Sequence, residues 1–347
     1  MRSPISLLII VLAALAGLAQ AQDIADIYSN LESCDVTVSG DVADSTLNLQ
    51  LSFEGKVIQT RSIALDGPGT WVATWSKFEA QEGSYQVCAA LARDGEQVAQ
   101  SCYAFSYGGR VPVRFDVRDF QADSRGIHMT IAARDPTIVD MDYMLISGNK
   151  VLYLGREEAY AITGGSYSPV LMIWEWKQLL DNGRRYAGRV KITELSHGQT
   201  RAFMTDFVAK DDARITETYE DEMGASATVL GSSRVPFEGK LRFVLFHNGT
   251  ELDSIEKKTP VLLVDDDETV EISWNETLDP GIYRLQVLLM GNNDDLLDMR
   301  ETVIEAEEMA RPAPAAEPEE ESPMPVGAAA LALLVLALAR GRRRSQA

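Results

Sequence analysis

A tryptophan, a turn and a tyrosine recur three times along this chain, roughly 100 residues apart, and this repeat constrains the fold more than any other feature. The three stretches are "WSKFEAQEGSY" from Trp75, "WKQLLDNGRRY" from Trp176 and "WNETLDPGIY" from Trp274. Each is followed by two strand-like runs that a polar turn joins, which is the pattern of a β-hairpin. A period of this length indicates tandem domains, because solenoid repeats are much shorter.

Hairpins are also predicted upstream of two of the tryptophans. "LNLQLSFEGKVIQTRSIAL" (47–65) parallels "LRFVLFHNGTELDSIEKKT" (241–259), and both contain a glycine-bearing turn. Short strands with frequent turns predict an all-β chain of three tandem sandwiches, over residues 22–108, 109–210 and 211–306. The middle unit carries a longer, tyrosine-rich stretch at 134–169, which we expect to form a recognition loop.

The phrase "LDPGIY", which ends at Tyr283, resembles a turn of immunoglobulin and fibronectin type III sandwiches. In those families a tyrosine at the start of a late strand bonds back to the preceding corner. The other two stretches resemble the turn less closely. The resemblance implies corner tyrosines at Tyr85, Tyr186 and Tyr283, and core tryptophans at Trp75, Trp176 and Trp274, rather than binding-site residues.

The N-terminal end predicts export. Residues 1–21 contain Arg2, an apolar run and the small-residue pattern Ala19-Gln20-Ala21, which together are typical of a secretory signal peptide. At the other end of the sandwiches, residues 307–323 are rich in proline, alanine and glutamate. This composition predicts an extended stalk.

The C-terminal segment, residues 324–347, predicts a membrane-directed tail. An apolar run from Val326 to Ala339 precedes a cluster of arginines, which should stay on the cytoplasmic side. With Pro323-Met324-Pro325, the tail resembles the sorting signals that exosortases and archaeosortases read, of the PEP-CTERM and PGF-CTERM types, although methionine replaces the central glutamate. That resemblance implies removal of the tail by a sorting peptidase, and a permanent membrane anchor is the alternative. The arginines are Arg340, Arg342, Arg343 and Arg344.

Three cysteines lie in a chain predicted to enter an oxidising compartment. Cys88 and Cys102 lie equally far on either side of Gly95, so they should face each other across a hairpin and form a disulfide. A bond between the two sheets from Cys34 to Cys88 is the alternative. If Cys34 is free, it is either a buried thiol or one half of an intermolecular bridge.

Residues that could carry chemistry are few. The three histidines share no metal-ligand spacing, and no nucleophile or phosphate-binding motif occurs, so we expect neither an enzyme nor a cofactor. Two polar clusters, 265–268 and 292–295, are expected to be solvated turns, with Asp265, Asp266 and Asp267 as weak candidates for Ca²⁺. Asn248 and Asn275 begin predicted N-glycosylation sequons.

The formal net charge of −20 leaves no basic surface for nucleic acid, so nucleic acid is not expected as a partner. The sequence predicts a non-enzymatic structural or adhesive protein of the cell envelope. Its expected partners are the membrane, through the tail, and other envelope proteins or further copies of itself. The alternative is a membrane-tethered extracellular binding module, such as the exterior subunit of a transporter, a sensor or an envelope enzyme complex.

Overall fold

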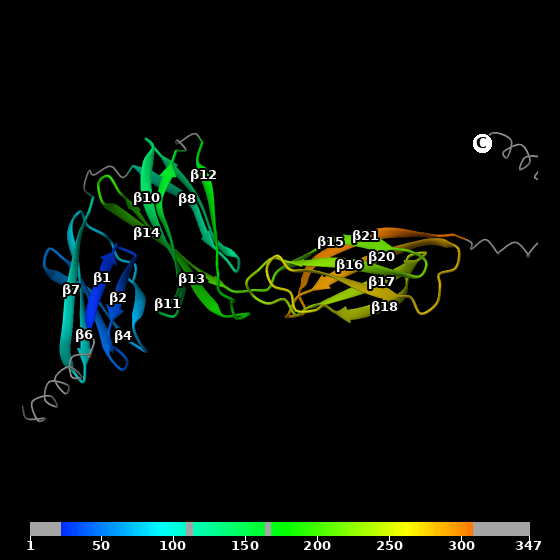
Figure 1. Ribbon diagram of the computed structural model, residues 1–347, viewed down its shortest axis with the longest axis horizontal. Helices are drawn as coiled ribbons and strands as arrows, with labels where there is room; N and C mark the ends of the chain where they lie inside the picture. Colours follow the sequence, from blue (N-terminus) through cyan, green and yellow to red (C-terminus); the bar gives the residue numbers. More distant parts are fainter. Residues whose placement is uncertain (1–21, 109–113, 164–167, 308–347) are drawn as a thin grey trace, which may run out of the picture.

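The computed structural model describes residues 22–108, 114–163 and 168–307, and these residues form strands β1 to β21 and no helix (Figure 1). The all-β prediction is therefore confirmed for this part of the chain. The strands fall into three consecutive groups, which we call units 1, 2 and 3. Unit 1 contains β1 (Asp23–Ser29), β2 (Ser33–Ser39), β3 (Thr46–Phe53), β4 (Lys56–Ala64), β5 (Gly69–Thr74), β6 (Gly83–Arg93) and β7 (Glu96–Tyr107).

The other two units repeat the same order of strands. Unit 2 contains β8 (Phe115–Ala122), β9 (Gly126–Ala133), β10 (Thr137–Ser147), β11 (Lys150–Ile162), β12 (Val170–Glu175), β13 (Arg185–Glu194) and β14 (Gln199–Val208). Unit 3 contains β15 (Ala213–Glu220), β16 (Gly224–Gly231), β17 (Lys240–His247), β18 (Thr250–Lys258), β19 (Asp267–Ser273), β20 (Gly281–Met290) and β21 (Leu296–Ala306).

Each unit is a sandwich of two antiparallel sheets with one shared topology. One sheet has the order β1-β2-β5 in unit 1, β8-β9-β12 in unit 2 and β15-β16-β19 in unit 3. The other has the order β4-β3-β6-β7, β11-β10-β13-β14 or β18-β17-β20-β21. In constant-type immunoglobulin domains the fourth strand joins the sheet of the first two. Here it stays beside the third strand in every unit.

Tight turns explain this placement of the fourth strand. In unit 1, β3 turns into β4 at Glu54 and Gly55, whose φ angles are 46° and 78°. In unit 3 the same turn falls at Asn248 and Gly249, with φ angles of 52° and 80°. Two consecutive residues with positive φ form the turn whose twist matches that of a hairpin. The connection therefore keeps the two strands in one sheet.

The three cores lie between the paired sheets and follow the alternation of each strand. In β3, Leu47, Leu49 and Leu51 are fully buried and pair with buried residues of β6. Burying one such leucine contributes about 2 kcal/mol. Each core also contains one tryptophan and one tyrosine of the repeat: Trp75 and Tyr85, Trp176 and Tyr186, and Trp274 and Tyr283.

The stretch 134–169 differs from the expectation of a recognition loop. Most of its described residues form a long hairpin of β10 and β11. This hairpin occupies the same position in unit 2 as β3 and β4 do in unit 1. Residues 164–167 lie outside the described part. Strand β10 is buried on both of its faces: Met141 and Tyr143 face the core of unit 2, whereas Met144 and Ile146 join a second apolar cluster with Val72 of unit 1.

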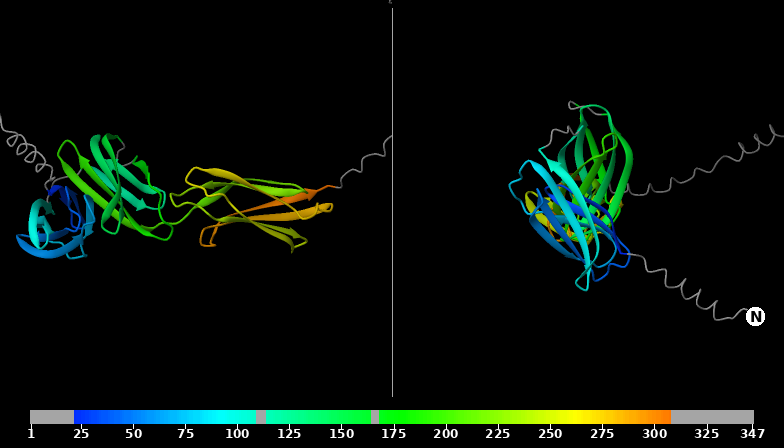
Figure 2. Two further views of the ribbon diagram at one scale, coloured as in Figure 1. Left: turned by 60° about the horizontal axis from the view of Figure 1, so that its bottom comes forward. Right: turned by 90° about the vertical axis from the view of Figure 1, so that its left-hand side faces the viewer.

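Units 1 and 2 lie side by side, and unit 3 extends away from unit 2, as the views in Figures 1 and 2 show together. None of the described residues belongs to a helix that is long and apolar enough to cross a membrane. The predicted signal peptide (1–21), the stalk after residue 307 and the tail (324–347), including Arg340, Arg342, Arg343 and Arg344, lie outside the described residues.

Candidate functional site

The tyrosines of the repeat make corner hydrogen bonds in all three units. The hydroxyl of Tyr85 donates to the carbonyl oxygen of Gln81 at 2.9 Å, and that of Tyr283 donates to the carbonyl oxygen of Asp279 at 3.0 Å. Tyr186 differs, because its hydroxyl donates to the side-chain carboxylate of Asp181 at 3.3 Å and accepts from the amide of the same residue at 3.1 Å. These tyrosines are structural residues.

The tryptophans are also structural. The indole nitrogen of Trp176 donates to the carbonyl oxygen of Asp123 at 2.9 Å, and that of Trp274 donates to the carbonyl oxygen of Asp221 at 3.2 Å. The indole of Trp75 donates to the hydroxyl of Ser29 at 3.2 Å. Each ring is therefore buried in its core with its only polar atom satisfied, as buried tryptophans require.

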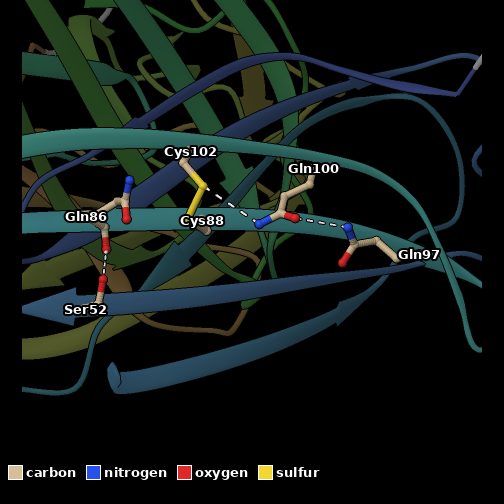
Figure 3. Close-up of a disulfide and its surroundings, with 6 residues drawn as sticks. All are labelled: Ser52, Gln86, Cys88, Gln97, Gln100 and Cys102. Atoms are coloured by element: carbon tan, nitrogen blue, oxygen red, sulfur yellow. Dashed lines mark hydrogen bonds between the residues drawn. A yellow bond between two sulfur atoms is a disulfide. The ribbon is translucent and has the colours of Figure 1, made fainter. Parts of the chain in front are cut away.

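A disulfide joins Cys88 on β6 to Cys102 on β7, directly across the hairpin (Figure 3). Cys34 is a free and fully buried thiol in the core of unit 1, where burial raises its pKa to about 12. The alternative bond from Cys34 to Cys88 is therefore wrong. An intermolecular bridge through Cys34 is also wrong, because its sulfur does not reach the surface.

The remaining predicted sites lie in turns and bends, except Asp267, which is the first residue of β19. Asn248 and Asn275 are both exposed, as glycan acceptors must be. The carboxylate of Asp266 accepts a hydrogen bond from the amide of Leu263 at 3.0 Å, so it stabilises its own turn. In the second polar cluster, the side chain of Asn292 bonds to the backbone of unit 3. Among the described residues, no group of three or more His, Cys, Asp or Glu side chains could hold a metal ion.

The most extensive set of contacts between units in the described chain is the interface between units 1 and 2, which was not predicted from the sequence. The outer face of β1-β2-β5 packs against the outer face of β10, β13 and β14. At the edge, the amide of Val72 on β5 donates to the carbonyl oxygen of Asn149 at 2.7 Å, and the Asn149 side chain donates back to Val72 at 2.8 Å. This contact continues the sheet of unit 1 into the four-stranded sheet of unit 2.

A buried charge cluster lies within this interface. The carboxylate of Asp35 on β2 accepts from the guanidinium of Arg189 on β13, and the side chains of both residues are almost completely buried. The same carboxylate accepts from Lys191 at 3.1 Å, and Lys191 also lies 3.3 Å from Asp26. The ring of Tyr28 lies 5.7 Å from both cationic groups. Opposite charges from the two units thus face each other, and the central pair of Asp35 and Arg189 is shielded from water.

The pKa values of this cluster follow from its burial and its charges. Burial alone would lower the pKa of Lys191, but Asp35 and the neighbouring carboxylates hold it above its usual value. Burial raises the pKa of the Tyr28 hydroxyl. Both groups therefore keep their ordinary protonation states at neutral pH, with lysine charged and tyrosine neutral.

Apolar contacts and backbone hydrogen bonds complete the interface. Val72 of unit 1 packs against Met144, Ile146 and Ala187 of unit 2. The hydroxyl of Tyr28 donates to the carbonyl oxygen of Thr200 at 3.2 Å. Hydrogen bonds, apolar packing and paired charges join these two units together, so we treat them as one body.

Two clefts flank the β1–β2 turn at this junction. The first has a volume of about 490 Å³ and is lined by Leu31, Trp75, Phe78 and Met204 among others. The second has a volume of about 400 Å³, and its lining includes the aromatic side chains of Tyr103, Phe105, Tyr107 and Phe203 beside polar residues such as Arg201. Volumes of this order suit a side chain or a small molecule.

The connection to unit 3 is narrower. Val235, from the loop between β16 and β17, is buried in the core of unit 2. The neighbouring Arg234 donates its amide hydrogen to the carbonyl oxygen of Ser124 at 3.0 Å and accepts from the amide of Leu180 at 2.9 Å. The loop between β16 and β17 thus links unit 3 to unit 2, and Asn292 of the β20–β21 turn lines a cleft beside it, whereas sheet faces join units 1 and 2.

The fold and these contacts define an all-β protein of tandem immunoglobulin-like sandwiches. No protein-family model matches the chain, and no curated protein matches it. Among solved structures, the chain is similar to a tetra-tandem repeat in the extending region of a large adhesion protein. The identity is 9%, 82% of this chain and 74% of that chain are covered, and the TM-score is 0.25.

Two similar structures are of alpha-2-macroglobulin from Escherichia coli. The trypsin-activated form has 12% identity and a TM-score of 0.24, and covers 82% of this chain and 23% of that chain. The native conformation has 12% identity and a TM-score of 0.21, and covers 82% of this chain and 22% of that chain. This chain thus spans less than a quarter of those proteins, and similarity at this level assigns no function to it.

Proposed function

We propose that this chain is a non-enzymatic surface protein of the cell envelope with a structural or adhesive role. The observation that carries the proposal is the buried interface between units 1 and 2, which we expect to hold them together as one rigid head. A protein that transmits force or presents a surface gains from such a joint, because a flexible linker would let the units rotate freely. Unit 3 lies between this head and the C-terminal segment, and so keeps the head at a distance from the point of attachment.

The disulfide supports a place outside the cytoplasm. Disulfides persist in oxidising compartments and are rare where thiols are kept reduced. Cys102 is exposed, so a reducing cytoplasm would have access to the bond. This agrees with the signal peptide that residues 1–21 predict. Beyond residue 307, the stalk and the arginine-flanked tail would hold the chain on the membrane, or deliver it to a sorting peptidase for display.

The test is carried out on intact native cells. A membrane-impermeant amine reagent should label exposed lysines such as Lys56 and Lys77, while a cytoplasmic control protein in the same cells stays unlabelled. Mass spectrometry of the C-terminal peptide then separates a retained tail from a cleaved one. Deletion of the gene should weaken cell-to-cell or cell-to-surface attachment. Absence of labelling on intact cells would contradict the proposal.

A second candidate, a membrane-tethered extracellular binding module, is favoured by one observation. The clefts at the junction are lined by apolar and aromatic side chains beside charged groups, as ligand sites commonly are. Phe78→Ala and Met204→Ala should then abolish copurification of a partner after mild detergent extraction. Tyr219→Ala, at an exposed position in unit 3, is the matched control and should leave copurification unchanged.

A further inference from the structure

The outer face of the sheet β4-β3-β6-β7 in unit 1, which we call the unit 1 sheet face, carries no charged side chain. On β3, the buried leucines alternate with outward-facing polar residues such as Asn48, Gln50 and Ser52. The register then places Gln86 and Cys88 of β6, and Gln100 and Cys102 of β7, on the same side. Figure 3 shows the disulfide with Ser52, Gln86, Gln97 and Gln100 around it. The face therefore consists mainly of small, hydroxyl and amide side chains, with the exposed Val57 of β4 beside Ser52.

This face is unusual for the chain that carries it. The formal net charge is −20, yet the charges of β3, β4, β6 and β7 lie at turns or on the opposite side of the sheet. The corresponding face of unit 3 is charged, with Arg284 beside Glu301 at 3.6 Å and Lys240 beside Glu256 at 3.3 Å. The same face thus carries ion pairs in unit 3 and uncharged side chains in unit 1.

The corresponding face of unit 2 supplies a precedent within the same molecule. Its residues on β10 and β13, including Met144 and Arg189, are covered by the sheet β1-β2-β5 of unit 1. Of three equivalent faces, one is therefore a docking surface already, one is solvated and charged, and one is uncharged and open. In lacking exposed ion pairs, the unit 1 sheet face resembles the docking surface of unit 2 more than the solvated face of unit 3.

We propose that the unit 1 sheet face binds the same face of a second copy of this chain, in a two-fold symmetric dimer. Two copies that each carry a large negative charge repel each other, and an uncharged face is where they approach at the lowest electrostatic cost. A two-fold interface must also be self-complementary. Amide and hydroxyl groups meet that condition because each both donates and accepts hydrogen bonds, whereas a face of one charge does not.

The size and relief of the face indicate how strong this contact is. Four strands about 4.8 Å apart and about nine residues long cover roughly 600 Å², which is below the roughly 800 Å² per partner of a standard interface. The side chains at the centre of the face are short, namely alanine, serine and the disulfide. Two such sheets can therefore stack at the usual distance of about 10 Å. Weak association follows, of the kind that many copies crowded on one surface would strengthen.

The inference deepens the proposed structural role, on which it rests, by naming the partner. The experiment is sedimentation of the purified full-length chain in mild detergent, over protein concentrations of about 1 to 500 µM. Wild type should shift from monomer to dimer, and more readily at high salt, since salt screens the repulsion between copies. Gln50→Lys should raise the dissociation constant at least about tenfold, although it lowers the net negative charge of each copy.

Gln286→Lys is the matched control, because Gln286 lies on the corresponding face of unit 3. It should leave the dissociation constant unchanged. A wild type that stays monomeric throughout, or Gln50→Lys and Gln286→Lys behaving alike, would overturn the inference, and the second result would assign any dimer to the tail. Surface display is measured on intact cells and dimerisation on purified protein, so the two proposals can fail separately.

Discussion

Arg189 and Asp35 lie 154 positions apart in the sequence and form a buried ion pair between two sandwich units. Each residue faces away from the core of its own unit, on β13 and on β2. The pair therefore exists only because one sheet face covers the other. Lys191 adds a second cation to the same carboxylate at 3.1 Å. Removing Asp35 leaves Arg189 buried without its counter-charge, which makes the joint between the units sensitive to a single substitution.

The first prediction concerns Asp35→Ala. This change leaves Arg189 buried and unpaired, and should lower the free energy of unfolding by about 3–5 kcal/mol. By differential scanning calorimetry, units 1 and 2 should unfold together in the wild type and separately in the variant. Asp66→Ala is the control, because Asp66 pairs with Lys150 across the same junction but is exposed, and it should cost less than about 1 kcal/mol.

The second prediction tests whether the charges are needed or only their pairing. The double variant Asp35→Leu/Arg189→Met removes both partners and fills the space with apolar groups. It should recover most of the stability that Asp35→Ala loses, because a paired buried charge is often no more stable than a well-packed apolar substitute. Equal destabilisation of both variants in urea unfolding would show that the charged pair itself holds the units together.

The third prediction is loss of stability at alkaline pH. Burial raises the pKa of Cys34 from 9.0 to about 12, so the folded state favours the neutral thiol. Its contribution is complete below pH 9.0 and is lost as pH rises toward about 12. The raised pKa of Lys191 acts in the same direction, since its contribution is lost as pH rises above 10.5.

Melting temperatures between about pH 8 and 11 check this prediction. The melting temperature of the wild type should begin to fall at about pH 9, in the transition that units 1 and 2 share. Cys34→Val keeps a similar side-chain volume. Its melting temperature should begin to fall only at a higher pH, because only the groups with higher pKa values remain. Parallel declines in the two proteins would mean that Cys34 does not contribute.

The fourth prediction concerns the disulfide. Replacing both Cys88 and Cys102 by serine should lower the stability of unit 1 by about 3 kcal/mol, because the closed loop limits the unfolded chain. A reducing agent should lower the melting temperature of the wild type by a similar amount and leave the variant unchanged. The transition of unit 3 serves as the internal control, since both of these cysteines lie in unit 1. An effect on unit 3 would contradict this assignment.

The fifth prediction separates the corner tyrosines from binding residues. Tyr85→Phe and Tyr283→Phe remove one hydroxyl each and should cost about 1 kcal/mol, the usual contribution of one hydrogen bond. The hydroxyl of Tyr85 both donates to Gln81 and accepts from its amide, so Tyr85→Phe should cost more than Tyr283→Phe. Urea unfolding measures both. A loss of adhesion without a loss of stability would assign these tyrosines to binding instead.

Much of the fold inside each unit could be predicted because its signals are local. Alternating leucines in β3, the turn at Gly95 and the spacing of Cys88 and Cys102 all lie within short stretches of sequence. The interface could not be predicted in the same way, since its hydrogen bonds join residues 77 to 172 positions apart. Two signals did exist: Asp35 interrupts a buried strand, and β10 reads "TIVDMDYMLIS", an apolar run too continuous for a strand with one solvated face.

The measurement that tests the rigid head most directly is the distance distribution between two spin labels, by double electron–electron resonance. The labels are placed at Glu96 in unit 1 and Gln178 in unit 2, which are both exposed. A single narrow distribution that matches the distance in the structure, and broadens in Arg189→Leu, is the predicted result. A broad distribution in the wild type would mean that units 1 and 2 move independently, and would contradict the account.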